Sequence, residues 1–454
     1  MRLRITSILL LCFLFLTGVV LLSLNGCGGS SSTPKRAGSN PFQHVLVIYQ
    51  ENRSPDNLFH GLPHADIANS GVNSLGQTIV LQPITLANKY DLGHSHADFV
   101  NMYDNGKMDG ADKVASCVPG SPGCPANPQF QYVNPSEVAP YFQLAEQYTF
   151  ADRMFQTNQG PSFPAHQFII SGTSAPTATS NLFAAENTEG GTGCAAPPAA
   201  SVRLIDPSGQ ESSKMYPCFE HPTLTDLLDS AGVSWKYYSP KPGSIWTGPN
   251  AIRHICAPSN GQCAGSDWTN NVILQKTQVL KDISDGTLPA VSWVIPTGQA
   301  SDHPLQNDGS GPSWVASIVN AVGNSQYWST TAMIIAWDDW GGWYDHVPPP
   351  QVRVNCSQWG CGYIYGFRVP MIVVSPLAKA GYVSHVNHDF GSILKFLEET
   401  FGLPSLGYAD AMADDLSDCF DFKQTPILFQ TISAPLDAAY FLNDPSAPLD
   451  PDDD

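Results

Sequence analysis

The stretch "AMIIAWDDWGGWYDHVPPP" (residues 332–350) decides the fold, because an apolar run typical of a buried strand ends in two adjacent aspartates. A second run, "HVLVIYQ" (44–50), ends in the same way in a glutamate and an asparagine. Neighbouring carboxylates raise each other's pKa unless a cation lies between them. We therefore predict a shared divalent metal at the carboxyl ends of two adjacent strands of an α/β sheet, the edge where such sheets keep their sites. The predicted ligands are Glu51, Asn52, Asp338 and Asp339.

The ligand chemistry restricts the metal to cations that accept oxygen donors. Carboxylate and amide oxygens suit Ca²⁺, Mg²⁺ and Mn²⁺, and Zn²⁺ also accepts carboxylates, so the identity stays open. The alternative for Asp338 and Asp339 is a plain surface turn. An apolar strand before them and Gly341-Gly342 after them, which permit a close approach of the backbone, favour the metal site.

Composition excludes some classes of protein. The chain has 454 residues, enough for one large α/β domain or two smaller ones, and its 42% hydrophobic content can fill a core. The formal net charge of −19 argues against a nucleic-acid partner. It also repels phosphate at long range, so phosphate chemistry requires a local cation.

The pattern of the chain predicts one domain over residues 42–422 with strands and helices in alternation, which favours a three-layer α/β/α sandwich. The predicted strands are Val45–Tyr49, Ala290–Ile295, Thr331–Trp337 and Val369–Ser375. The predicted helices are 221–232, 312–323 and 388–402. Residues 174–220 read as a disulfide-tied insertion. Residues 423–454 form a Pro/Asp-rich C-terminal tail, which is expected to fray from Asp437 onward.

Ser162 in "TNQGPSFPAHQFIISG" (157–172) is the candidate nucleophile. It follows a Gly-Pro turn at the predicted start of a helix, where free N–H groups attract phosphate and a nearby metal lowers the hydroxyl pKa. A simple capping serine is the alternative. Histidines near predicted strand ends are candidates for stabilising the transition state or protonating a leaving oxygen. These are His94, His96, His254, His303 and His346.

The N-terminus has the pattern of an export signal. Arg2 and Arg4 precede an apolar run of roughly 15 residues, which is short for a membrane span. "LNGC" (24–27) resembles a bacterial lipobox, which predicts a leader over 1–26, a lipid anchor at Cys27 and a flexible tether over 27–41. The alternative is an ordinary cleaved signal in which this cysteine is incidental.

Export favours oxidised cysteines. Sequence neighbours suggest four local bridges and leave Cys419 without a partner, although spacing alone cannot fix connectivity. The suggested pairs are 117–124, 194–218, 256–263 and 356–361.

Six blocks of sequence together resemble the bacterial phosphoesterase family, which includes phosphatidylcholine-type phospholipases C and acid phosphatases and is similar in fold to alkaline phosphatases. They occur in the family's order and span nearly all of residues 44–422. The blocks are "HVLVIYQENRSPDNLFHG" (44–61), "NGKMDGAD" (105–112), "GPSFPAHQFIISGT" (160–173), "SWVIPTGQASDHP" (292–304), "WDDWGGWYDHVPPP" (337–350) and "GFRVPMIVVSPLAKAGYVSH" (366–385).

The resemblance implies that the four oxygen ligands hold a divalent metal, that Ser162 becomes transiently phosphorylated, and that His94, His254 and His303 surround the phosphate. Phospholipases of the family often carry Thr at the position of Ser162 and phosphatases carry Ser, which weakens a phospholipase reading. The substrate is then a phosphoester small molecule or a phospholipid. The chain departs from the family phrase again at Pro55, where Phe is usual.

Two other classes of protein are alternatives to a phosphoesterase. A sulfatase-like hydrolase needs a "CxPxR" or "SxPxR" motif, and residue 162 does not begin one. A non-catalytic, surface-anchored binding lipoprotein with a structural metal is the alternative outside the enzymes. The GxSxG, HExxH and GxxxxGK[ST] motifs are also absent from the sequence.

Overall fold

Two buried parallel strands form the centre of the fold. β1 (His44–Gln50) pairs with β16 (Thr331–Trp337) along its whole length, with Gln50 opposite Trp337. Both strands are buried nearly throughout, as expected for apolar strands covered on both faces. The register brings the residues that follow the two strands side by side. The computed structural model describes residues 40–206, 208–352 and 364–449.

The central sheet is mixed, in the order β14-β11-β15-β1-β16-β17-β6-β18. β17 runs antiparallel to both of its neighbours, and the other pairs are parallel. The prediction of strands in this sheet is confirmed within two residues at each end. The remaining strands of the sheet are β14 (Val272–Ile273), β11 (Trp235–Tyr238), β15 (Val291–Val294), β17 (Met371–Val374), β6 (Thr149–Ala151) and β18 (Tyr382–Ser384).

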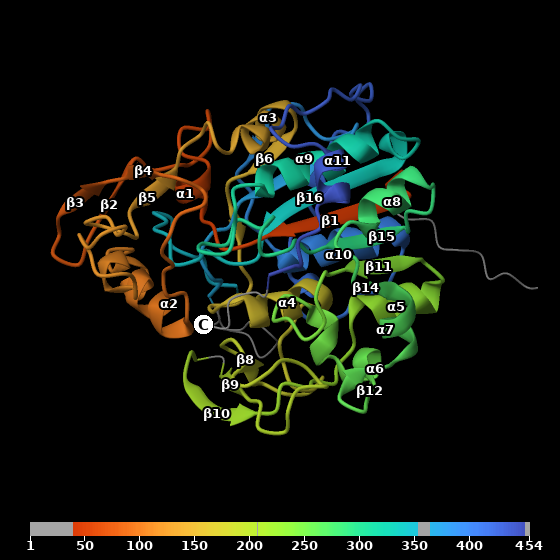
Figure 1. The fold of residues 1–454 in the computed structure, drawn as a ribbon, viewed down its shortest axis with the longest axis horizontal. Coiled ribbons are helices and arrows are strands. Elements are labelled where there is room, and N and C mark those ends of the chain that lie inside the picture. Colours follow the sequence, from red (N-terminus) through yellow and green to blue (C-terminus); the bar gives the residue numbers. More distant parts are fainter. Residues whose placement is uncertain (1–39, 207, 353–363, 450–454) are drawn as a thin grey trace, which may run out of the picture. The chain divides into compact units, whose positions relative to one another are not determined.

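Helices pack in two groups. α9 (Gly311–Gly323) contacts α3 (Ala139–Gln147), α8 (Gln278–Ser284) and α11 (Ala438–Asn443). α4 (Ser162–Ser171) contacts α10 (Phe390–Phe401) and α5 (Leu224–Ala231). In Figure 1, β1 and β16 run between α9 and α11 on one side and α10 and α4 on the other.

The three predicted helices form, and two of them end at the capping residues that the sequence predicted. α5 ends at Gly232 and α10 at Gly402, and both glycines adopt the left-handed conformation of a helix C-cap. Asp389 caps α10 by accepting a hydrogen bond from the backbone N–H of Ser392. Local sequence signals therefore account for these boundaries.

Shorter elements build the loops around the sheet. β8 (Phe183–Ala184), β9 (Val202–Ile205) and β10 (Glu211–Met215) form a small sheet within the predicted insertion, residues 174–220. The other helices are α1 (Pro55–Leu58), α2 (His96–Tyr103), α6 (Arg253–Cys256) and α7 (Ser266–Asn271). The other strands are β2 (Ser70–Val72), β3 (Thr78–Val80), β4 (Gln82–Ile84), β5 (Gln131–Val133), β7 (Met154–Phe155), β12 (Pro258–Ser259), β13 (Gln262–Cys263) and β19 (His388–Asp389).

The predicted disulfides are confirmed wherever the structure describes both cysteines. The bridges are Cys117–Cys124, Cys194–Cys218 and Cys256–Cys263. Cys419 is a free, buried thiol, as predicted. The suggested pair 356–361, the leader 1–26 and the proposed anchor at Cys27 lie outside the described residues.

The described part of the C-terminal tail packs against α9, and this includes Phe441 in the segment that was expected to fray. Ile432 is buried and exchanges two hydrogen bonds with the side chain of Asn320 on α9. Phe441 on α11 packs edge-on against Trp314 of α9 with ring centroids 5.2 Å apart. Scattered apolar side chains in a Pro/Asp-rich segment are enough to dock it on the apolar face of a helix.

Within residues 40–206, 208–352 and 364–449, none of the helices has the length and apolar character needed to cross a bilayer.

A buried ion network ties the loop after β16 to α1. The guanidinium of Arg368 donates to both carboxylate oxygens of Asp345, at 2.8 and 2.9 Å, and to Asp56 at 3.3 Å. His346 lies 2.8 Å from Asp56. Arg368, Asp345 and Asp56 are all fully buried, so each charge depends on its partners.

We predict that Arg368→Met lowers the free energy of unfolding by about 3–5 kcal/mol, because it leaves two buried carboxylates without their cation. Urea unfolding followed by fluorescence measures it. The control is Arg153→Met, which removes a half-exposed ion pair with Asp66 and should cost less than about 1 kcal/mol. Equal costs for the two variants would contradict the assigned role of Arg368.

Candidate metal centre and active site

The ends of β1 and β16 bring the four predicted ligands together. The backbone N–H of Asn52 donates to Asp338 Oδ1 at 3.1 Å, and the N–H of Asp339 donates to the same oxygen at 2.7 Å. The N–H of Asp338 donates to the Gln50 carbonyl, which continues the β1–β16 ladder past the strand ends. All four side chains are fully buried. Adjacent parallel strands thus deliver the two acidic pairs to one place.

Several polar atoms of this group have no hydrogen-bond partner in the protein. They are both carboxylate oxygens of Glu51, Asn52 Oδ1 and Asp338 Oδ2. Burial, and next the charge of Asp338, raise the pKa of Glu51 well above its ordinary value, and the same two causes raise the pKa of Asp339. Unpartnered oxygens that converge in a buried place are the donor set that a hard divalent cation needs. The residues therefore fit the predicted metal.

The backbone beside the ligands is shaped for close contact. Asn52 has a φ of 59°, a left-handed conformation that asparagine tolerates better than most residues. Gly341 has a φ of 60°, and a side chain there would collide with the carbonyl oxygen of Asn52. This observation supports the interpretation of the Gly341-Gly342 pair as a close approach.

Ser162 points at the same group. It is the first residue of α4, one position inside the predicted cap, and its hydroxyl donates to Asp339 Oδ2 at 3.1 Å. The N-cap position of α4 is occupied by Pro161 and not by Ser162, and the N–H of Phe163 donates to Asn187 Oδ1. The alternative of a simple capping serine is therefore wrong.

Two of the three histidines that the family resemblance places around the phosphate border the group. Asn52 Nδ2 lies 3.3 Å from His94 Nε2, and His94 Nδ1 lies 2.9 Å from the Leu92 carbonyl. The carbonyl requires a proton on Nδ1. The ring of His303 lies beside that of His94, with centroids 6.2 Å apart. Both imidazoles are buried.

Arg53 connects the first ligand pair to the His303 loop. Its guanidinium donates to the carbonyl oxygen of Asp302 at 2.7 and 2.9 Å. The same guanidinium lies over the indole ring of Trp343. The Asp302 carboxylate accepts hydrogen bonds from Tyr141 and Trp337. Burial raises the pKa of Asp302 to about 6. Arg53 thus holds the backbone next to His303 in place.

His166 is a member of the group that the sequence analysis missed. Its Nε2 lies 3.4 Å from Glu51 Oε1 and 3.8 Å from Asp338 Oδ2, and the ring is fully buried. Burial lowers the pKa of His166 to about 4, so the ring is neutral at pH 7. The signal was its spacing: His166 follows Ser162 by four residues, so both lie on one face of α4.

His254 lies in a different environment from the one predicted. It is half-buried in α6, and its two nitrogens lie 2.8 Å from Glu220 and 3.2 Å from Asp226. Hydrogen bonding to Asp226, acting against burial, raises the pKa of His254 to about 9. The described contacts do not join it to Ser162 or to the oxygen ligands.

A cleft of about 350 Å³ adjoins the group. Its lining includes His94 and Pro161, which directly precedes Ser162, together with Asp98 and Glu186. Glu186 accepts a hydrogen bond from the backbone N–H of His96 at 2.9 Å. Burial, followed by the contact with Glu211, raises the pKa of Glu186 to about 8. The cleft therefore opens beside the start of α4, next to Ser162.

Sequence comparison agrees with this geometry. The family model described as "Phosphoesterase family" matches residues 42–404, so the chain belongs to the phosphoesterase family.

Named relatives of the chain are phospholipases C. Hemolytic phospholipase C of Pseudomonas aeruginosa is 26% identical over 445 residues, covering 84% of this chain and 56% of that protein. Phospholipase C B of Mycobacterium tuberculosis is 26% identical over 470 residues, covering 91% of this chain and 83% of that protein. The chain therefore spans little more than half of the first relative and most of the second.

Similar solved structures include a protein of the alkaline phosphatase superfamily from Vibrio parahaemolyticus, with 11% identity and a TM-score of 0.35 over 83% of this chain and 72% of that one. The lipoteichoic acid synthase LtaP from Listeria monocytogenes has 8% identity and a TM-score of 0.36, over 84% of this chain and 80% of that one. TM-scores this low do not establish a shared fold. The α/β fold class is assigned from the central sheet and its helices.

We predict that Asp338→Asn stabilises the chelator-treated protein by about 1–3 kcal/mol, because it removes one of several buried like charges. Thermal unfolding with excess EDTA measures the change. The matched control is Asp389→Ala, since Asp389 is equally buried but caps α10, and loss of the cap should cost about 0.5–2 kcal/mol. Loss of stability in both variants would contradict an unpaired charge at Asp338.

We predict that His254→Asn lowers stability by less than about 1 kcal/mol and leaves phosphoester hydrolysis within about twofold, because its ion pairs are partly screened by solvent. The folded-state pKa of about 9 lies above the unfolded value, so the pairs stabilise fully below pH 6.5 and lose their effect as the pH rises through 9. Unfolding of wild type and variant between pH 6 and 10 shows the difference. A large loss of turnover in this variant would show that His254 belongs to the active site.

Proposed function

We propose that the chain is a metal-dependent hydrolase of phosphoric esters with Ser162 as nucleophile and a phosphoserine intermediate. The observation that carries the proposal is the hydroxyl of Ser162, which donates to Asp339 beside three other oxygen ligands with unpartnered atoms. Membership of the phosphoesterase family supports the reaction class.

The metal ligands in this proposal are Glu51, Asn52, Asp338 and Asp339, and a divalent cation bound there supplies positive charge that lowers the pKa of the serine hydroxyl and neutralises phosphate oxygens. Asp339 orients Ser162 Oγ through the 3.1 Å hydrogen bond. His166 is neutral and lies against Glu51 and Asp338, where it holds the two carboxylates in position.

The reaction has two steps. Ser162 Oγ releases its proton to solvent water and attacks phosphorus, the bond from phosphorus to the leaving oxygen breaks, and that oxygen takes up a proton from a histidine. His303 Nδ1 lies 2.7 Å from the Pro304 carbonyl and therefore carries a proton, so the ring delivers a proton to the leaving alcohol from Nε2 only as the imidazolium, and it returns to the neutral form in that step. Water then attacks the phosphoserine, releasing phosphate or phosphomonoester and restoring Ser162. His94, fixed by Asn52 and Leu92, borders the phosphate.

Two substrate classes stay open within this reaction. A phosphatase-like monoesterase fits the serine at position 162, and a phospholipase C-type phosphodiesterase acting on phospholipid head groups fits the names of the relatives. The non-catalytic binding lipoprotein is disfavoured because the hydroxyl of Ser162 contacts a metal ligand rather than capping its helix.

The proposals for the fold, the export signal and the lipid anchor follow the predictions from the sequence. We propose that the helices on the two faces of the sheet make the three-layer α/β/α sandwich of alkaline-phosphatase-like proteins. The domain follows a cleaved leader and a tether, and lipidated Cys27 anchors the exported protein in the bacterial cell envelope. The membrane is then a partner through this anchor, and nucleic acid is not a partner.

We predict that Ser162→Ala lowers kcat/KM by at least about 1,000-fold, or ~4 kcal/mol, because the covalent route is lost. The assay uses p-nitrophenyl phosphate and a p-nitrophenyl phosphodiester, which separate the two substrate classes. The control is Ser171→Ala at the other end of α4, where the hydroxyl donates to the Gln167 carbonyl, and turnover should stay near wild type. EDTA should abolish turnover and one added ion should restore it. Wild-type turnover by Ser162→Ala would contradict the proposal.

A further inference from the structure

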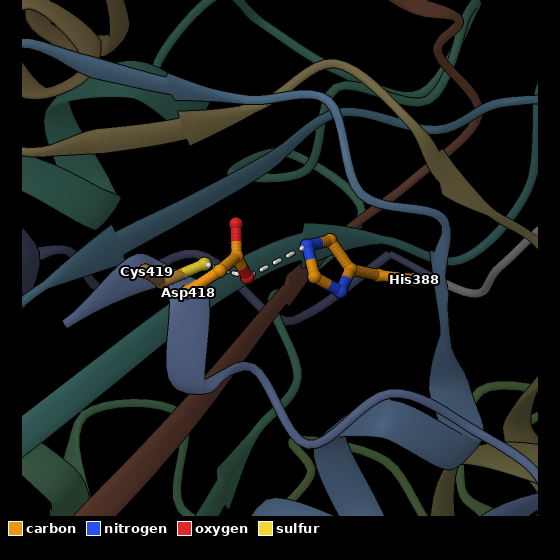
Figure 2. A group of neighbouring side chains, drawn as sticks. All are labelled: His388, Asp418 and Cys419. Atoms are coloured by element: carbon orange, nitrogen blue, oxygen red, sulfur yellow. Dashed lines mark hydrogen bonds and ion pairs between the residues drawn. The ribbon is translucent and has the colours of Figure 1, made fainter.

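A second cluster of metal-binding side chains lies away from the proposed active site, at the edge of the sheet. His388 belongs to β19, and Asp418 and Cys419 belong to the short 3₁₀ turn η6 (Ser417–Cys419). Figure 2 shows the imidazole, the carboxylate and the thiol turned toward one another from these two segments. One donor atom of each lies within 4.8 Å of the other two.

The donor separations resemble those of a tetrahedral zinc site. His388 Nε2 lies 3.5 Å from Asp418 Oδ1, and Cys419 Sγ lies 3.6 Å from the same oxygen. Zinc bond lengths of about 2.0 Å to nitrogen or oxygen and 2.3 Å to sulfur imply tetrahedral donor separations of about 3.3–3.5 Å. A Zn²⁺ ion therefore fits among these atoms with small side-chain movements.

The imidazole is also oriented as a metal ligand is. Asp414 Oδ1 lies 3.0 Å from His388 Nδ1, the nitrogen on the far side of the ring from Asp418. His388 Nδ1 makes no aligned hydrogen bond in this arrangement, and a small rotation of the ring would let Asp414 accept Nδ1–H and leave the lone pair on Nε2 for a metal. His388 is 1% exposed and Cys419 is fully buried, so both donors are shielded from bulk water.

The two other groups of possible metal ligands contain no cysteine. Among the described residues, the group of Asp56, Asp345 and His346 already contains the guanidinium of Arg368, which satisfies the carboxylates. The group of Glu51, His166 and Asp338 belongs to the proposed active site. The His388 cluster offers a thiol as well, and sulfur together with imidazole selects zinc over calcium or magnesium.

We propose that His388, Asp418 and Cys419 bind a structural Zn²⁺ ion, with Asp414 holding the imidazole of His388. Binding displaces the proton of the Cys419 thiol to solvent, and thiolate and carboxylate together balance the dication. Ser384 Oγ, 3.1 Å from His388 Nε2 and hydrogen-bonded to Asp418, stands at the fourth position, which it or a water fills.

The site joins two segments that are distant in sequence. β18 (Tyr382–Ser384) is the terminal strand of the central sheet, and η6 packs against it. A metal shared between β19 and η6 pins the segment that leads into the C-terminal tail to this edge. The inference does not depend on the proposed phosphoesterase reaction, because no residue of the two sites is shared.

Cobalt substitution tests the proposal by a signal that only a thiolate site gives. Metal-free protein, prepared with chelator under anaerobic conditions, is titrated with Co²⁺ and followed by absorption spectroscopy. We expect a near-ultraviolet sulfur-to-cobalt charge-transfer band in the wild type, displaced by added Zn²⁺. The band should be lost in Cys419→Ala and in His388→Asn, and bound zinc measured by mass spectrometry should fall by about one ion per chain.

Two controls keep the test specific. His385→Asn alters a largely exposed histidine three residues away that pairs with Asp152, and the band should persist. Asp338→Asn/Asp339→Asn alters the proposed active site, which contains no sulfur ligand, and the band should again persist. Cys419→Ala should leave phosphoester turnover unchanged, and zinc should raise the Tm of the wild type but not of this variant. A wild type without the band, or a band that survives Cys419→Ala, would overturn the proposal.

Discussion

Electrostatic repulsion among buried acids is the constraint on which the rest of the structure depends. Glu51, Asp338 and Asp339 lie fully buried at the ends of two paired strands, and burial together with mutual repulsion raises the pKa of Glu51 and Asp339. Buried carboxylate oxygens without hydrogen-bond partners destabilise a folded protein, so their presence here indicates a role other than stability. In the proposed function, a divalent cation bound among these acids removes the repulsion and creates a site for phosphate.

The surrounding structure is organised to hold these acids at one point. The β1–β16 register aligns the two ligand pairs, and Gly341 allows the backbone of the second pair to approach Asn52. Arg53, immediately after the first pair, fixes the loop of His303 through the carbonyl of Asp302. α4 then presents Ser162 and His166 from one face. Each contact reaches across a long sequence distance, so the site exists only when the whole sheet is assembled.

Much of this arrangement could be predicted from local sequence. Apolar runs that end in paired acids located Glu51, Asn52, Asp338 and Asp339, since parallel strands share their carboxyl edge. Capping residues located the ends of α5 and α10, and short spacing located the three described disulfides. These features depend on neighbours in sequence or on the geometry of a sheet.

What could not be predicted depends on tertiary contacts. His254 was predicted to border the phosphate, but its pairing with Glu220 and Asp226 is set by loop packing. His166 was missed because an imidazole on an apolar helix resembles a core residue until its neighbours are known. The packing of the tail on α9 was not predicted either, because composition does not reveal the face of this helix that Ile432 and Phe441 cover.

The most direct test of the central claim is anomalous diffraction from crystals of the protein soaked with Mn²⁺. The account predicts an anomalous peak enclosed by Glu51, Asn52, Asp338 and Asp339, within about 2.0–2.6 Å of their oxygens. Crystals that bind Mn²⁺ elsewhere but show no peak among these four side chains would contradict it.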